Sequence, residues 1–258
     1  QSRCNIEAVD VDYLGLPPEK LADDINVIFT TPSHHCPTAA TMPLSRRKRL
    51  LAKAQELDAI IVEDDYEFEM SFLEPALPAL KSLDNDGRVI YVGSFSKSLF
   101  PGMRLGYLVG PAPFIKEARA LRASVLRHPP GHIQRTAAYF LSLGHYDALI
   151  KRMSKQYEER YLEMEKSLTK FDLKIAGKAQ HGGSSFWVET PKCTNAVKLA
   201  QKLLEMDVVI EPGDPFFVGE NHPKNFIRLA YSSISTNKIA AGIELIAEAI
   251  SDTGPITA

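Results

Sequence analysis

The sequence predicts an α/β fold in which helices cover a mostly parallel sheet, followed by a smaller α+β domain. Strand-like apolar runs bounded by turn residues occupy 25–30, 59–63, 88–93 and 105–110. The runs are apolar along their whole length, as is typical of parallel strands that are buried on both faces. A helical pattern separates the first two runs, and this strand–helix–strand order indicates a parallel sheet.

The helical segment between the first two strands covers 43–57 and reads PLSRRKRLLAKAQEL. Ser45 is its predicted N-cap, because a short hydroxyl side chain can accept the first free amide of a helix. Arg46 to Arg49 form a strongly basic run in a chain whose formal net charge is −2. We interpret this run as the solvated face of the helix, and a nucleic-acid contact is the less favoured alternative.

The second half of the chain is predicted to be largely helical. Helical patterns occupy 112–126, 132–144 and 146–171, and two more lie at about 194–206 and 236–251. Strand-like runs at 184–189, 208–212 and 226–231 are interleaved with the last two helices. This mixture predicts a small α+β domain that is joined to the first domain through the long helix. We therefore divide the chain into a partial large domain at 1–150 and a small C-terminal domain at 151–258.

The composition predicts a globular, cytoplasmic protein without a membrane segment. The 258 residues are 45% hydrophobic and 24% charged, which is ample for a large core. Cys4, Cys36 and Cys193 share no metal-ligand spacing and indicate reduced thiols. No apolar run approaches the roughly 20 residues that span a membrane, and the N-terminus lacks the apolar core of a signal peptide. The chain opens directly on a strand-like pattern, so we expect a fragment of a longer protein.

Polar side chains follow three of the predicted strands, at the ends where open parallel sheets bind their ligands. TPSHHCPT follows the first strand, DDYEFE the second and SFSK the third. If these strands are parallel neighbours, one edge of the sheet collects His35, Asp64, Tyr66, Ser94, Ser96 and Lys97. Each residue alone has an ordinary structural explanation, as a cap, a packed ring or a solvated lysine. Their coincidence on one edge favours a ligand site.

The residue types on this edge suit pyridoxal phosphate. A sheltered lysine amine can form a Schiff base with an aldehyde. A carboxylate beside the pyridine nitrogen keeps that nitrogen protonated, so that the ring withdraws electrons. Serine hydroxyls and a forked guanidinium suit the oxygens of a phosphate monoester. The residues that provide this set are Asp64, Lys97, Ser94, Ser96 and Arg104.

At 93–107 the text GSFSKSLFPGMRLGY resembles the Schiff-base segment of fold-type I aminotransferases. Together with TPSHHCPT, IVEDDYEFEM and IKRMSKQYEERY, it makes the chain similar to the MocR/GabR transcription regulators of the GntR family. These regulators join an N-terminal winged helix-turn-helix to an aminotransferase-like domain that senses an effector through the cofactor. The resemblance implies a cytoplasmic homodimer that binds an amino-acid-like effector. It also implies that DNA is contacted only through an N-terminal domain absent from this chain.

The resemblance implies a role for each residue of the site. Lys97 would form the internal aldimine with pyridoxal phosphate, and Asp64 would pair with the pyridine nitrogen. Tyr66 would donate a hydrogen bond to the phenolic oxygen of the ring. The phosphate would be held by Ser94, Ser96 and Arg104. Arg228, in FIRLAYSS, matches the arginine that clamps an effector carboxylate, and a surface arginine on a strand is the alternative interpretation.

Three features depart from the pattern of common aminotransferases. Cys36 and Ala39 stand where those enzymes carry an asparagine and a glycine, so we expect no ring contact from this loop. Asp64 and Tyr66 are two residues apart, as in the regulators, and not three apart. The family's helix-turn-helix, glycine-containing phosphate turn and ring-stacking aromatic residue would all precede Gln1.

Three functional interpretations are open at this point. The favoured one is the effector-sensing part of a MocR/GabR-like regulator, and a genuine aminotransferase acting on an amino acid is the alternative. A scaffold without cofactor is less favoured, because Asp64, Lys97 and Arg104 are all present. We expect the chain by itself neither to bind operator DNA specifically nor to sustain transamination.

Overall fold

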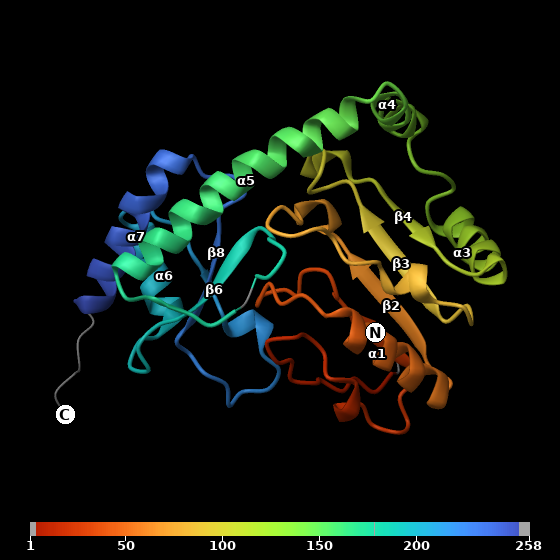
Figure 1. Ribbon diagram of the computed structural model, residues 1–258, viewed down its shortest axis with the longest axis horizontal. Coiled ribbons are helices and arrows are strands. Elements are labelled where there is room, and N and C mark those ends of the chain that lie inside the picture. Colours follow the sequence, from red (N-terminus) through yellow and green to blue (C-terminus); the bar gives the residue numbers. More distant parts are fainter. Residues whose placement is uncertain (1–3, 178, 253–258) are drawn as a thin grey trace.

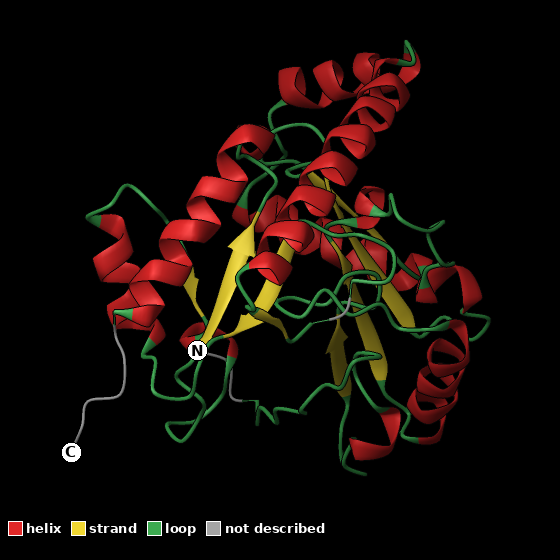
Figure 2. Ribbon diagram, turned by 60° about the vertical axis from the view of Figure 1, so that its left-hand side comes forward, coloured by secondary structure: helices red, strands yellow, loops and turns green. Residues whose placement is uncertain are grey.

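The computed structural model describes residues 4–177 and 179–252, and these residues form two four-stranded sheets. In the first sheet the order is β1 (Val27–Thr30), β2 (Ile60–Asp65), β3 (Val89–Ser94) and β4 (Gly106–Val109). In the second the order is β5 (Lys174–Ile175), β6 (Ser185–Glu189), β8 (Phe226–Ala230) and β7 (Glu211–Pro212). Figure 2 shows the two sheets as separate groups of strands with helices outside them. The predicted α/β fold with a smaller α+β domain is confirmed.

Helices occupy the predicted places with small differences at their ends. They are α1 (Leu44–Glu56), α2 (Leu80–Leu83), α3 (Ala112–Val125), α4 (Gly131–Ser142), α5 (His145–Lys170), α6 (Ala196–Leu204) and α7 (Thr236–Ser251). The long α5 leads from α4, beside the first sheet, to α6 and α7, beside the second (Figure 1). Short 3₁₀ turns lie at Pro18–Lys20, Phe68–Met70, Pro101–Met103 and Asp214–Phe216. In the described ranges no helix has both the length and the apolarity needed to cross a membrane.

The first sheet is parallel from β1 to β3, and β4 runs antiparallel to β3. The register pairs Thr30 with Glu63 and Asp65 with Gly93. The carboxyl ends of the three parallel strands therefore lie at the same edge, and the loops that follow them meet there. This is the edge at which the sequence predicts a ligand site.

One face of the first sheet is packed against α1, and the other is more exposed. Ile61 and Val89 point to one face and form a core with Leu50 of α1. On the opposite face Phe29 is 76% exposed, and Val27 is also exposed. Because successive residues of a strand point to opposite faces, Asp64 lies on the open face and its neighbours on β2 lie on the covered one.

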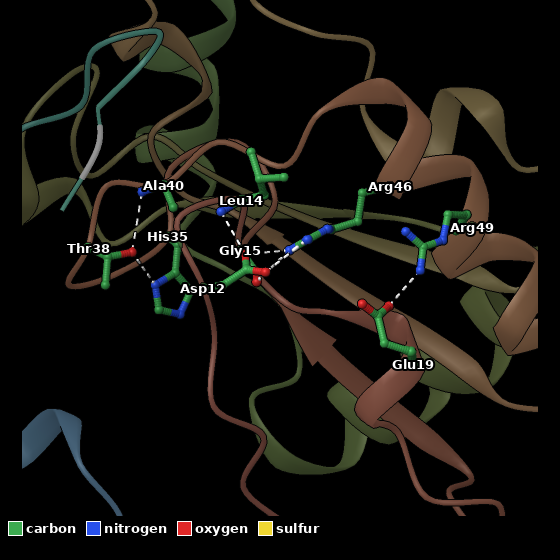
Figure 3. Close-up of polar contacts among 9 residues, drawn as sticks. All are labelled: Asp12, Leu14, Gly15, Glu19, His35, Thr38, Ala40, Arg46 and Arg49. Carbon is green, nitrogen blue, oxygen red and sulfur yellow. Dashed lines mark hydrogen bonds and ion pairs between the residues drawn. The ribbon is translucent and has the colours of Figure 1, made fainter.

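The start of α1 corrects two expectations from the sequence. The N-cap is Pro43, whose carbonyl accepts the amides of Arg46 and Arg47, while Ser45 is exposed in the first turn. The basic run is a solvated face only in its second half: Lys48 and Arg49 are exposed, whereas Arg46 and Arg47 are buried. Arg46 binds Asp12 through both terminal nitrogens, at 2.5 and 2.9 Å (Figure 3).

Arg47 is fully buried beneath the carboxyl edge of the first sheet. Its guanidinium donates to the carbonyls of Met42, Pro78 and Pro32 at 2.9–3.0 Å. It also lies 4.0 Å from the carboxylate of Glu63, which accepts the amides of Leu80 and Lys81 at 2.7 and 2.8 Å. This buried pair therefore ties the loops after β1 and β2 to α1 and α2.

Asp65 is buried near Arg47 and Glu63, and its ionisation makes the stability of the fold depend on pH. Burial raises the pKa of Asp65 from 3.8 to about 7, and the charge of Glu63 adds to the effect. The folded state thus binds the proton more tightly than the unfolded state, so the stabilisation is complete below about pH 4 and is lost as the pH rises through 7. We expect the free energy of unfolding, measured with urea, to fall between about pH 5 and 8 by about 2–3 kcal/mol more in the parent than in the Asp65→Asn variant. If the free energy of unfolding depended on pH in the same way in both proteins, the raised pKa of Asp65 would be refuted.

The second sheet packs one face on helices and turns the other toward the first sheet's loops. Phe186, Val188 and Ile227 form the core with α5, α6 and α7. The opposite face presents Trp187 and Arg228, which are direct cross-strand neighbours. The strand predicted at 208–212 pairs only over Glu211–Pro212.

Candidate cofactor and effector site

The hairpin of β3 and β4 explains the spacing of the serines, the lysine and the arginine. Ser94 pairs with Gly106 across the hairpin, and the amide of Phe95 donates to the carbonyl of Leu105 at 3.0 Å. The chain turns back through Pro101–Met103, so residue 104 returns to the end of β3. A Cβ at Gly106 would lie 2.7 Å from the carbonyl oxygen of Gly93, so this close pairing requires glycine.

The returning residue is Arg104, in the left-handed region with φ of 49°. Its side chain is exposed, and within the described residues no hydrogen bond or ion pair engages it. Nearby, the amide of Ser96 donates to the hydroxyl oxygen of Ser94 at 3.1 Å, which leaves both hydroxyl protons available. A guanidinium and two hydroxyls carried by one hairpin are groups that can bind a phosphate monoester.

Asp64 lies on β2, the strand next to this hairpin. It lies opposite Val92 of β3, on the open face of the sheet, and is exposed. Asp64 has no hydrogen bond or ion pair to any described residue. A carboxylate in this position is free to accept a hydrogen bond from a ring nitrogen of a bound group.

Lys97 lies in the turn that follows β3, with its side chain 38% exposed. Its Nζ is 3.3 Å from Oε1 of Glu67, which is buried. The same oxygen accepts the hydroxyl of Ser184, from the loop that leads into β6. The lysine is therefore connected through one carboxylate to the second sheet.

The loop after β1 lies against Tyr66 and Arg228. Burial raises the pKa of Tyr66 and, to a smaller extent, so does the charge of Glu67, so the hydroxyl is a neutral donor. The hydroxyl lies 3.5 Å from the carbonyl of His34 and also contacts the thiol of Cys36. Burial raises the pKa of Cys36 too, so the thiol is protonated at neutral pH.

His35 has a structural role within the same loop. Its Nδ1 lies 2.9 Å from the hydroxyl of Thr38, whose oxygen also accepts the amide of Ala40 at 3.3 Å (Figure 3). Burial lowers the pKa of His35 to about 4, so the ring is neutral. Ala39 has φ of 56°, which explains why a glycine suits this position in the aminotransferases.

Arg228 lies on β8 of the second sheet and is largely sheltered from solvent. Its side chain is 15% exposed. Its Nε donates to the hydroxyl of Ser185 at 3.0 Å, and its Nη1 donates to Glu211 at 2.7 Å. Its charge lowers the pKa of Cys36 and Tyr66 against the larger effect of burial, which places it opposite the loop after β1.

Most of the predicted residues thus lie on the strand ends and loops at one edge of the first sheet. Ser94, Ser96 and Arg104 share the hairpin, Asp64 and Tyr66 lie at the end of β2, and Lys97 follows β3. Arg228 lies on β8 of the second sheet. Sequence reasoning missed Glu67 and Glu211, which form ion pairs with Lys97 and Arg228. Glu67 was visible as a third acid in DDYEFE, but the chain direction after β2 could not be read from the sequence.

Comparison with known proteins agrees with this geometry. The family of class I and II aminotransferases matches residues 4–246. The HTH-type transcriptional regulator TauR of Rhodobacter capsulatus is 56% identical over 94% of this chain and 50% of its own length. Aromatic-amino-acid aminotransferase 1 of Thermococcus litoralis is 31% identical over 95% of this chain and 60% of its own length. The chain spans about half the length of the curated regulators it matches.

Among solved structures, the kynurenine aminotransferase of Pyrococcus horikoshii, in complex with PMP, superposes with a TM-score of 0.88 and 30% identity. The superposition covers 96% of this chain and 64% of that one. The prediction of pyridoxal phosphate as the cofactor is confirmed at the level of the family. The chain belongs to the class I and II aminotransferase family, with a fold-type I architecture, and its resemblance to MocR/GabR-type regulators is confirmed.

Proposed function

We propose that this chain is the effector-sensing, aminotransferase-like domain of a MocR/GabR-like transcription regulator. The observation that carries the cofactor site is the β3–β4 hairpin, which returns an unpaired Arg104 to the serines around Lys97. The identity of 56% to a regulator supports the sensing role over a catalytic one. Residues 1–150 form part of the large, cofactor-binding domain and 151–258 form the small domain.

Each residue of the site has a defined task in this proposal. When bound, pyridoxal phosphate supplies an aldehyde that takes up amines and a ring that withdraws electrons. Lys97 provides the amine that holds the aldehyde, and Asp64 accepts a charge-assisted hydrogen bond from the ring nitrogen. Tyr66 donates its neutral hydroxyl to the ring oxygen. The phosphate oxygens are bound by Ser94, Ser96 and Arg104.

The effector is an amino-acid-like molecule with an amine at one end and an anion at the other. The amine reaches the lysine side of the site, and the anion binds Arg228. Ser185 and Glu211 already accept one donor each from this arginine. The guanidinium has five N–H donors in a planar fork, so the others are available to the effector. Ser185 and Glu211 hold the fork in one orientation.

The intact protein is proposed to be a cytoplasmic homodimer that contacts DNA through a domain outside this chain. An aminotransferase acting on an amino acid is the second candidate, favoured by 31% identity to an aminotransferase over 95% of the chain. A panel of amino acids added to the intact, cofactor-loaded protein separates the two. A sensor should change its visible absorbance with selected amino acids and form no more than one equivalent of keto acid. Sustained keto-acid formation would replace the sensor with the enzyme.

The Arg228→Lys variant should lose the response to amino acids although the charge is kept. A lysine carries its three donors on one nitrogen and has no planar fork, so it cannot bind an effector carboxylate through two parallel hydrogen bonds while it keeps the contacts with Ser185 and Glu211. We expect the amino-acid concentration at half-maximal absorbance change to rise at least about tenfold, on the scale of about 1.4 kcal/mol per factor of ten. Arg49→Lys, in an exposed pair with Glu19, is the matched control and should respond as the parent does. An unchanged response in Arg228→Lys would remove the clamp from the proposal.

A further inference from the structure

Glu67 is a nearly buried carboxylate that the proposed function does not explain. Its side chain is 4% exposed, directly after Tyr66 at the end of β2. Within the described residues Lys97 is the cation at ion-pair distance, 3.3 Å away. A buried carboxylate is destabilising without a counter-charge. The free energy of burying Glu67 therefore depends on whether Lys97 is a free ammonium.

The lysine has two states if the proposed function holds. When an effector amine replaces it, the C=N bond from the cofactor's aldehyde carbon to Lys97 breaks as a C=N bond to the effector nitrogen forms. The effector nitrogen arrives as an ammonium and the lysine leaves as one. With a proton on the nitrogen of each C=N bond, two protons pass from the effector nitrogen to the lysine nitrogen, and the total charge is unchanged. The released ammonium then requires an anion in a sheltered place.

We propose that Glu67 is a positioning residue that receives the Lys97 ammonium when an effector amine takes the lysine's place. This inference rests on the proposed function and adds the means by which the released lysine is stabilised. The structure shows the contact that a released ammonium would make, with Nζ of Lys97 3.3 Å from Oε1 of Glu67. Glu67 thereby shifts the exchange toward the effector-bound form, because it stabilises one product of the exchange.

The contacts of Glu67 lead through two adjacent serines to Arg228, the proposed effector-binding arginine. Oε1 of Glu67 also accepts the hydroxyl of Ser184, which is anchored in the second sheet by the amide of Tyr231 at 3.0 Å. The next residue, Ser185, accepts the Nε of Arg228. Two adjacent serines therefore contact Glu67, on the amine side of the proposed effector, and Arg228, on its anion side. One peptide bond joins the residue that contacts Glu67 to the residue that contacts Arg228.

A first test uses the intact protein freed of cofactor, so it does not depend on activity. Lys97→Met leaves the carboxylate without its cation and should lower the urea midpoint of unfolding. Adding Glu67→Gln to that variant should raise the midpoint again, because the uncompensated charge is gone. A double variant no more stable than Lys97→Met would overturn the pairing.

A second test measures exchange with methylamine, which has no anion and so bypasses Arg228. In Glu67→Gln the cofactor should still attach to Lys97, with its visible absorbance retained. The methylamine concentration at half-exchange should rise at least about tenfold. Glu67→Asp should stay within about threefold of the parent, since it keeps the charge. Glu69→Gln is the matched control, because Glu69 binds Tyr146 and not the lysine.

The outcomes separate this inference from the function on which it rests. A parent protein that shows no lysine-dependent absorbance contradicts the proposed function, and the inference is lost with it. A parent that attaches and exchanges normally, beside a Glu67→Gln variant with the same half-exchange concentration, overturns the inference alone. A tenfold shift in Glu67→Gln with recovery in Glu67→Asp supports it.

Discussion

Replacing Lys97 with alanine is expected to abolish the visible absorbance of the cofactor-loaded protein. The absorbance depends on the covalent link between the lysine amine and the cofactor's aldehyde, and alanine has no amine. Lys97 follows β3 and lies in the sequence between Ser96 and Arg104. Any cofactor that still binds would be held only by its phosphate and ring contacts, and dialysis should remove it.

Lys53→Ala is the matched control for this prediction. Lys53 is 24% exposed and pairs with Asp23, so it is a sheltered, ion-paired lysine on α1, outside the proposed site. Its loss should leave the absorbance and the cofactor content unchanged. A Lys97→Ala protein with the parent's spectrum would mean that another residue carries the cofactor.

Replacing Arg47 with methionine should cost about 3–5 kcal/mol of unfolding free energy. The change keeps an unbranched side chain of similar length, but it leaves Glu63 buried without its nearby cation and removes the guanidinium donors from three carbonyls, of which that of Pro32 keeps the amide of Met42. The free energy is measured by urea unfolding of the intact protein near neutral pH. Because the loops after β1 and β2 depend on this residue, cofactor affinity should fall as well.

An exposed arginine on the same helix separates this effect from a general loss of charge. Arg49 forms an ion pair with Glu19 in which both side chains are more than half exposed. Solvent screens such a pair, so Arg49→Met should cost less than about 1 kcal/mol. Equal losses in the two variants would show that burial of Arg47 is not the cause.

Much of the fold could be predicted from the sequence because its long elements have strong patterns. The helices at 112–126, 132–144 and 146–171 and the strands of the first sheet follow from apolar periodicity. Short elements were missed or mislocated. The two-residue β5 and the four-residue α2 have no pattern of their own and exist through contacts with the rest of the fold. The run at 208–212 is apolar, but only its last two residues find a partner strand.

The site was predicted less evenly. Ser94, Ser96 and Arg104 are close in the chain and lie in one hairpin, so sequence spacing was informative. The first half of the basic run was misread, because Arg46 and Arg47 are buried and pair with Asp12 and Glu63, which are distant in the sequence. Glu67 and Glu211 were missed for the same reason. Each is one acid among several, and its importance comes from the cation that the fold brings to it.

Reduction of the loaded protein with borohydride, followed by peptide mapping, tests the central claim most directly. The reagent converts the link between the cofactor and its lysine into a stable secondary amine, so the modified residue can be located. The account predicts one phosphopyridoxyl group, on Lys97, in the intact protein loaded with pyridoxal phosphate. Modification of another lysine, or of none, would contradict the assignment of this edge of the sheet as the cofactor site.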